Sequence, residues 1–343
     1  VELFSSSQLL VRASNADSNG LTNNGRVHLY SGGAGGGGGP SGTLGTQTFG
    51  TNPSGSVTIT PAQITAITNT GTAVVLQANS DITLAASSDI VANNPSGNGG
   101  DLTLQAGRSV FLHSNIVTDD GNLTVVANEA VANGVDAANR DAGQAVISMA
   151  DGTAINAGTG NVAMHLRDTA GTVLLRSVTA HDLTVTAPGA TIQIGSEGAS
   201  VASNIQLTGT AVLGPAISDP LPINELAALV VLQGGASGAF AQLAADGDIS
   251  VASADVKLVN GGSFARMVIP TGLGAITLAG TCSICDKISV TEIAGPASVG
   301  ATPSLNDMLA IGIKPTFEPP RDPTDAIEEE EPEIAVDAGE TCQ

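Results

Sequence analysis

Aromatic residues are almost absent from this sequence. They make up 2% of its 343 residues, with no tryptophan and a single tyrosine, Tyr30. A large globular enzyme usually builds part of its core from aromatic rings, because each ring buries a large apolar area. Valine, isoleucine, leucine and alanine must fill the core here instead. A thin core of this kind is typical of a narrow solenoid.

Basic residues are also scarce. Lys and Arg total 11 against 32 Asp and Glu, which gives a formal net charge of -21. Nucleic acids and anionic membranes are both bound through Lys and Arg, so the charge argues against either partner. The sequence has no apolar run of the ~18 residues that a membrane-spanning helix needs, and we therefore expect none. Only three cysteines occur, too few for a small fold held together by disulfides.

A short phrase recurs along the chain: a polar residue, an apolar one, a small polar one and a second apolar one. The clearest copy is Asp101-Leu102-Thr103-Leu104. The copies begin at Asp81, Asp101, Asn122, Asn161, Asp182, Asn204 and Asp248. Most successive starts lie about 21 residues apart, and the two longer steps are close to twice that length, so we interpret them as double steps.

Most periods hold a second alternating run, such as 109–113, 172–176 or 191–194, and Gly, Asn, Asp and Ser separate the runs. Alternation of apolar and polar residues predicts strands with one buried face. Several short strands per period, with no run of helix length between them, predict an all-β fold: a right-handed parallel β-helix with coils of about 21 residues. Each coil buries its inner face only by stacking on its neighbours.

Composition divides the chain into four parts. Residues 1–54 form an irregular N-terminal segment with a strand near Val27 and a glycine-rich loop. Residues 55–290 form the β-helix, interrupted by an insertion at 214–234 with a short helix over 223–229. A C-terminal cap over 291–317, with a helix from Ser304, follows. The tail 318–343 has ten acidic residues and one basic residue, so it should be solvated and mobile.

The phrases at 98–107 and 121–128 resemble the repeats of filamentous-haemagglutinin-like exoproteins, the β-helical cargo of bacterial two-partner secretion. The resemblance covers roughly residues 55–290. It implies a cell-surface or extracellular adhesin, biofilm-matrix, haem-scavenging or toxin-carrying protein of a Gram-negative-type bacterium. The secretion domain typical of that family is not recognisable, so we interpret the chain as a C-terminal portion or a processed product.

Some members of that family have a pair of cysteines near the C-terminus, in a small disulfide loop that holds the protein at its outer-membrane transporter. Cys282 and Cys285 are the candidates for this role, although they lie well before the end of the chain. Free thiols, a metal site and a redox pair remain alternatives, but zinc would need two further ligands at suitable spacing. Cys342 either pairs between chains or stays free.

The remaining candidate sites favour ordinary structural roles. The four histidines, His28, His113, His165 and His181, are far apart in sequence, and a haem ligand among them is a minor alternative. The turns 119–121 and 246–248 contain aspartates but match no complete calcium loop. No constellation of catalytic residues stands out, and the chain lacks the aromatic platform that polysaccharide-active β-helix enzymes use.

The sequence therefore predicts a structural or adhesive extracellular protein, a stiff acidic rod, with no enzymatic activity and no cofactor. Its expected partners are other copies of itself, joined end to end or by strand exchange, the outer-membrane transporter, and a host or matrix ligand. A polysaccharide-active enzyme and a haem- or metal-capturing exoprotein are the alternatives.

Overall fold

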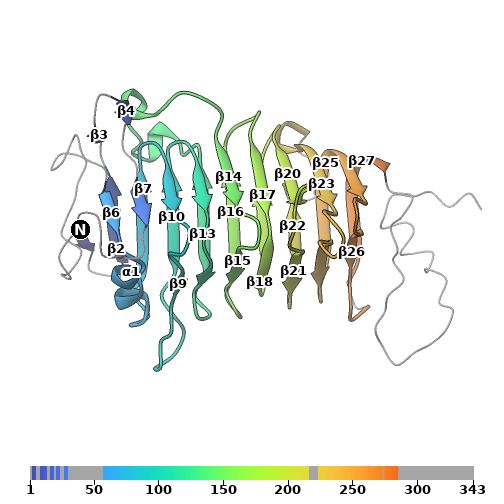
Figure 1. The fold of residues 1–343 in the computed structure, drawn as a ribbon, viewed down its shortest axis with the longest axis horizontal. Coiled ribbons are helices and arrows are strands. Elements are labelled where there is room, and N and C mark those ends of the chain that lie inside the picture. The colour runs from blue at the N-terminus through green and yellow to red at the C-terminus, as the bar shows by residue number, and fades with distance from the viewer. Residues whose placement is uncertain are drawn as a thin grey trace, which may run out of the picture.

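The structure, a computed structural model, describes residues 57–215, 223–272 and 274–284, together with the backbone of five short strands before residue 30. Its strands stand side by side along one long axis (Figure 1). All strand pairings are parallel apart from the β1–β2 and β3–β4 hairpins, and the strands stack as a solenoid with three faces. The predicted all-β parallel solenoid is thus confirmed in its general form.

Faces 1 and 2 belong to one large sheet, because β25 and β27 run from the first face onto the second. Face 1 contains β2 (Gln8–Ala13), β7 (Ala73–Ala78), β10 (Leu102–Ala106), β13 (Leu123–Ala127), β16 (Val162–Leu166), β19 (Leu183–Thr186), β22 (Ala211–Leu213), and the first parts of β25 (Ile249–Val259) and β27 (Ile276–Ile284). Face 2 contains β5 (Val27–Leu29), β6 (Val57–Ile59), β8 (Ile82–Leu84), β11 (Val110–Leu112), β14 (Val146–Met149), β17 (Thr172–Leu175), β20 (Thr191–Gly195), β23 (Ala227–Gln233), and the remainders of β25 and β27.

Face 3 is a separate seven-stranded sheet. It contains β9 (Ile90–Val91), β12 (Ile116–Val117), β15 (Ala154–Asn156), β18 (Ser177–Ala180), β21 (Ser203–Leu207), β24 (Ala241–Ala245) and β26 (Ala265–Val268). The other elements are β1 (Glu2–Phe4), β3 (Ala16–Ser18), β4 (Leu21–Asn23), the helix α1 (Pro61–Thr68), and the 3-10 turns η1 (Val131–Asn133), η2 (Ala137–Asn139) and η3 (Ile223–Glu225). No helix in the described ranges is both long and apolar enough to cross a membrane.

The core consists of aliphatic side chains stacked in register from coil to coil. On face 2, one inward position is occupied in turn by Ile82, Val110, Ile147, Val173, Ile192, Val230 and Val256. Each of these side chains is at most 1% exposed. No aromatic residue is among the buried core residues of the described part of the chain. The scarcity of aromatics in the sequence therefore reflects a core only a few side chains wide.

The recurring polar residue of the phrase has a structural role at the corner before face 1. The side-chain oxygen of Asp101 accepts the backbone N–H of Asn122, 2.9 Å away, one coil further on. The side-chain oxygen of Asn122 accepts the backbone N–H of Asn161 at 2.9 Å, and the side-chain oxygen of Asn161 accepts the backbone N–H of Asp182 at 3.1 Å. Asp182 accepts the N–H of Thr210 at 2.7 Å. This series, the corner ladder, supplies acceptors for N–H groups where the chain turns.

Glycine precedes most residues of the corner ladder because neighbouring coils approach closely there. A Cβ atom on Gly100 would lie 1.9 Å from the carbonyl oxygen of Thr72, and one on Gly160 would lie 2.4 Å from that of Gly121. Such contacts are too short for any side chain. The glycine and the polar residue after it therefore mark the entry to face 1.

Coil length is not uniform, and the interpretation of the longer steps as double coils is wrong. Along the corner ladder, Asn122 follows Asp101 by 21 residues, but the next step, to Asn161, is 39 residues. Strand β13 pairs directly with β16, so a single coil spans this longer step. The two steps after it are 21 residues and 28 residues. A coil of the predicted length therefore occurs but is not general.

Two copies of the phrase lie on other faces. Asp81 precedes β8 on face 2, and Asn204 belongs to β21 on face 3. All three faces alternate apolar and polar residues in the same way, so the pattern does not reveal the face on which a strand lies.

The N-terminal boundary also differs from the prediction. Strands β2 and β5 pair in parallel with β7 and β8, so the segment before residue 55 already contributes to the solenoid. Helix α1, which the sequence analysis missed, contacts β7 on face 1 and β9 on face 3. A capping box starts it: Thr60 accepts the N–H of Gln63, and the side chain of Gln63 accepts the N–H of Thr60.

The insertion predicted at 214–234 is shorter than expected. Residues 227–233 form a strand, β23, rather than a helix, and β23 pairs with β20 and β25 in the face 2 stack. Buried Val230 and Leu232 continue the core there, and this contact with two neighbours outweighs the helix propensity of the Ala-Ala-Leu run. The glycine-rich loop, the cap at 291–317 and the tail at 318–343 lie outside the described residues.

The corner ladder yields a testable prediction about stability. Substitution Asn161→Ala removes the acceptor of the Asp182 N–H, and we expect a loss of about 1 kcal/mol, seen as a lower melting temperature by circular dichroism. Thr184→Val, on the outer side of the adjacent strand β19, is the control and should have little effect. Equal melting temperatures for Asn161→Ala and the wild-type protein would show that the ladder contributes nothing.

Candidate functional site

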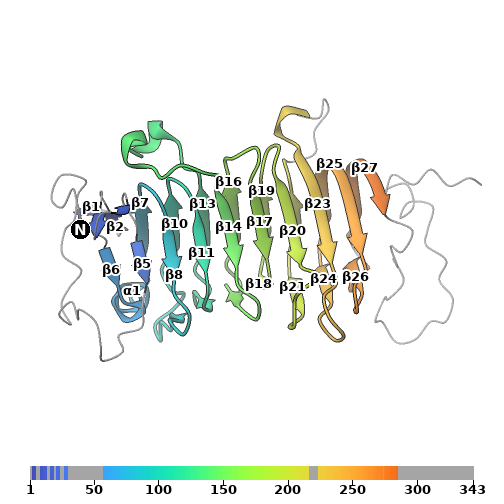
Figure 2. The ribbon, with the colours of Figure 1, turned by 45° about the horizontal axis from the view of Figure 1, so that its top comes forward.

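The most prominent ordered projection from the rod is the segment 128–145, which we call the 128–145 loop. It connects β13 on face 1 to β14 on face 2 and contains η1 and η2, and it stands out at one side of the stack (Figure 2). Val135 is 8% exposed, and its Cγ1 lies 2.9 Å from where a Cβ on Gly107 would be. The loop therefore packs onto the coil beneath it.

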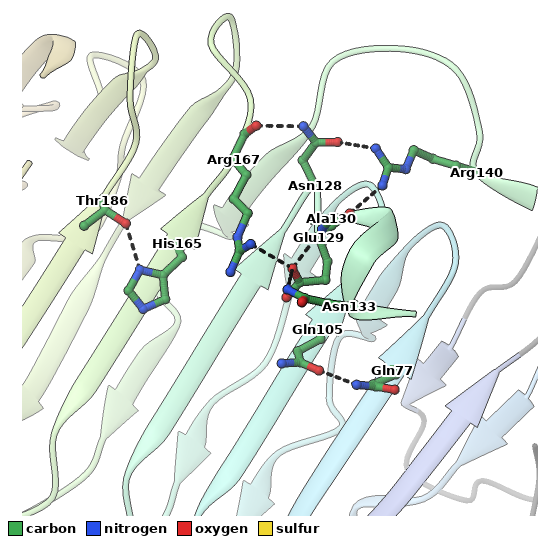
Figure 3. Close-up of polar contacts among 10 residues, drawn as sticks. All are labelled: Gln77, Gln105, Asn128, Glu129, Ala130, Asn133, Arg140, His165, Arg167 and Thr186. Carbon is green, nitrogen blue, oxygen red and sulfur yellow. Dashed lines mark hydrogen bonds and ion pairs between the residues drawn. The ribbon is translucent and has the colours of Figure 1, made fainter. Parts of the chain in front are cut away.

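A buried carboxylate holds the start of this loop. Glu129 is 3% exposed, and its Oε1 accepts from the Ala130 N–H at 2.8 Å and from Asn133 Nδ2 at 2.7 Å. The same oxygen pairs with Arg167 Nη1 at 3.1 Å, and Arg167 follows β16 in the next coil (Figure 3). Pairing with a cation and two hydrogen-bond donors offsets the cost of burying the carboxylate.

Two further side chains complete this cluster. Asn128, which has a positive φ of 54°, donates from Nδ2 to the carbonyl oxygen of Arg167 at 2.8 Å. Its Oδ1 accepts from Arg140 Nη1 at 2.8 Å, and Arg140 also donates to the carbonyl oxygen of Glu129 (Figure 3). Asparagine tolerates a positive φ better than most residues, which favours it at this bend. The loop is thereby closed on itself.

Arg108 fixes the far end of the loop to the solenoid. Its Nε donates to Asp81 Oδ1 at 2.8 Å, and its Nη1 donates to the carbonyl oxygen of Ala142 at 3.0 Å. Asp141 lies 3.5 Å from Nη2. The hydrogen bond with Asp81 is the main cause that raises the pKa of Arg108. Arg108 therefore joins a corner of the rod to the loop above it.

This arrangement holds a surface loop in place. Its carboxylates and guanidinium groups bind one another and the backbone. It fixes a loop that exposes Val131, which is 55% accessible to solvent. Sequence reasoning missed the cluster, because the residues that meet belong to different coils and are distant in sequence. The long step between Asn122 and Asn161 was the available signal.

The histidines do not form a site in the described structure. His165 is half-buried on β16, with Nδ1 2.7 Å from Thr186 Oγ1, whereas His181 is exposed and contacts Thr208 at 3.0 Å. Burial first, and then the charge of Arg167, lowers the pKa of His165, which favours its neutral imidazole. His113 is exposed beside Phe111, and only the backbone of His28 is described.

The two aspartate turns bind backbone groups of neighbouring coils. Asp119 accepts the N–H of Asn94 from the preceding coil, and Asp120 accepts that of Thr159 from the following coil at 2.7 Å. Asp248 accepts the N–H of Ala275 at 2.8 Å. Within the described ranges, no group of three or more His, Cys, Asp or Glu side chains is arranged to hold a metal ion.

Cys282 lies on β27, on the last rung of the described solenoid. It pairs in register with Val256, so it continues the inward face 2 series, and it packs partly buried against the core. Beside it, Ser283 donates from its N–H and Oγ to Asp255 at 3.1 and 2.7 Å. Cys282 is disulfide-bonded. Cys285 and Cys342 lie outside the described residues, so the pairing with Cys285 remains a prediction.

No protein-family model matches this chain, and no curated protein and no solved structure is significantly similar to it.

The buried carboxylate makes the 128–145 loop sensitive to one substitution. We expect Glu129→Ala to speed amide hydrogen exchange at Ala130 and Asn133 by tenfold or more, corresponding to roughly 1.4 kcal/mol or more. The strands of face 1 should keep their protection. Glu225→Ala, an exposed acid in the other insertion, is the matched control. Unchanged exchange in Glu129→Ala would mean that packing alone holds the loop.

Peptide mapping without reduction identifies the partner of Cys282. Trypsin cleavage after Arg266 and Lys287 leaves Cys282 and Cys285 in one peptide, and we expect that peptide to gain mass on reduction with both thiols becoming alkylatable. A peptide cross-linked to the segment after Arg321 would instead assign Cys342 as the partner.

Proposed function

We propose that this chain is a rigid spacer of a secreted bacterial surface protein, a right-handed parallel β-helix that displays contact loops away from the cell. The single observation that carries the proposal is the unbroken series of parallel pairings on face 1, from β2 to β27. Eight such steps of roughly 4.8 Å each make a rod of about 40 Å.

Stiffness supports a mechanical role. Backbone hydrogen bonds run along the axis on all three faces, and the aliphatic core is continuous through them. Bending such a rod would break pairings on one face and compress the opposite one. A solenoid in which each coil contacts only its neighbours also extends without changing its cross-section.

The loops support a role in contact. Two long connections, the 128–145 loop and the segment from β22 to β23, join face 1 to face 2. Their 3-10 turns project on the same side of the rod in both views (Figures 1 and 2). Contacts with a host or matrix ligand, or with other copies of the chain, would be made there or at the rod ends.

The resemblance to filamentous-haemagglutinin-like exoproteins supports an extracellular location and secretion through an outer-membrane transporter. The glycine-polar corner that carries the resemblance, as at Gly100-Asp101 and Gly121-Asn122, is the same corner that sets the register of face 1. The high negative charge favours solubility of a protein exposed outside the cell.

Electron microscopy and cell fractionation test the proposal together. We expect purified protein to form straight, narrow particles of constant width, and antibodies to detect the chain on intact producing cells or in the medium. Filaments at high concentration would support assembly through the rod ends, and monomeric rods alone would limit the role to a spacer. Protein confined to the cytoplasm, or compact round particles, would contradict the proposal.

A further inference from the structure

A column of buried polar side chains runs through the solenoid just before face 3. Five strands of face 3 pair in register: β9, β12, β15, β18 and β21. The positions two residues before their paired inward residues are therefore also aligned across these five successive coils. These inward positions hold Ser88, Ser114, Thr153, Arg176 and Ser203, each at most 7% exposed. In the next two coils the same position is alanine, Ala241 and Ala265. One formal charge, that of Arg176, therefore lies in this column.

The first part of the column satisfies its own polar groups. Ser114 Oγ accepts the N–H of Ser88 at 2.8 Å, and Thr153 Oγ1 donates to the carbonyl oxygen of Ala150 at 2.7 Å. The second part does not. Arg176 Nε and Nη1 and Ser203 Oγ are buried, and within the described chain they have no hydrogen-bond partner. Buried polar groups in folded proteins nearly always have one.

Asp151, the nearby carboxylate, is engaged elsewhere. Its Oδ2 accepts from the N–H of Ser200 at 2.8 Å and from Ser200 Oγ at 2.7 Å. Burial acts to raise the pKa of Asp151, but the Ser200 hydrogen bonds and then the charge of Arg176 outweigh it, and the pKa falls. Arg176 has no ion pair within 4.0 Å in the described structure.

The contact between Asp151 and Ser200 spans the coil that contains Arg176. Asp151 lies in the turn before β15 and Ser200 in the turn before β21, whereas Arg176 alone forms the corner between β17 and β18. The N–H of Arg176 donates to Met149 Sδ, 3.4 Å away. The backbone of Arg176 therefore contacts a core side chain, and its coil lies between the two bridged turns.

We propose that Arg176 and Ser203 bind a small monovalent anion of the size of chloride. The guanidinium is a donor-only group, and Ser203, at the aligned position one coil further on, adds a hydroxyl that also lacks a partner within the described chain. A halide accepts from all of them and neutralises the buried charge, whereas a water molecule would bring two hydrogens that need acceptors. Arg176 and Ser203 are only 6% and 1% exposed, which favours a small ion over a large one.

Bromide replacement tests the site in the wild-type protein. Crystals grown in sodium bromide should show an anomalous peak within contact distance of Arg176 Nε and Nη1 and of Ser203 Oγ. A peak only elsewhere on the protein, or density at Arg176 with no anomalous signal, would overturn the proposal and assign a water molecule instead.

The solution test measures melting temperature as chloride replaces gluconate at constant ionic strength. An anion that binds only the folded state raises the melting temperature with its concentration. We expect this rise in the wild-type protein, a chloride affinity reduced several-fold in Ser203→Ala, and no rise in Arg176→Met. Lys257→Met, at a partly exposed cation outside both the column and the Glu129 cluster, is the matched control and should keep the rise.

Arg176→Met should fold, since an unbranched apolar side chain suits this position. If it does not, the bromide peak and the Ser203→Ala titration still decide the matter. Chloride-independent melting of the wild-type protein would overturn the proposal.

Discussion

The register between neighbouring coils is the constraint on which this structure depends. Inward side chains lie in register with those at the same position one coil before and one coil after, as in the series from Ile82 to Val256. The core is therefore a set of columns. Within the described residues, these columns are filled mostly by aliphatic side chains and contain no buried aromatic ring.

Different corners of the coil serve different purposes. The corner before face 1 is short, glycine-rich and tied by the series Asp101, Asn122, Asn161 and Asp182, so it sets the register. The corner between faces 1 and 2 varies in length and contains the 128–145 loop and the segment from β22 to β23. The 128–145 loop is then held by its own residues Glu129 and Arg140 and by Arg108 and Arg167 of neighbouring coils.

The strands and the solenoid could be predicted from alternation and recurrence, but the position of each strand could not. The phrase at Asn204 has the same pattern as the phrase at Asp182, yet the two lie on different faces. Residues 227–229 belong to the segment predicted as a helix, 223–229, but pairing with β20 and β25 makes them part of a strand. The Arg176 column and the Glu129 cluster required the register, because their members are distant in sequence.

The corner ladder has a direction, and this has a kinetic consequence. In each step of the series from Asp101 to Thr210, the oxygen belongs to the earlier coil and the N–H to the later one. A coil that has already formed therefore presents a row of acceptors to the residues that follow it in the chain. A polypeptide whose N-terminal end is available first can add one coil at a time onto a finished template, so folding can advance from that end along the chain.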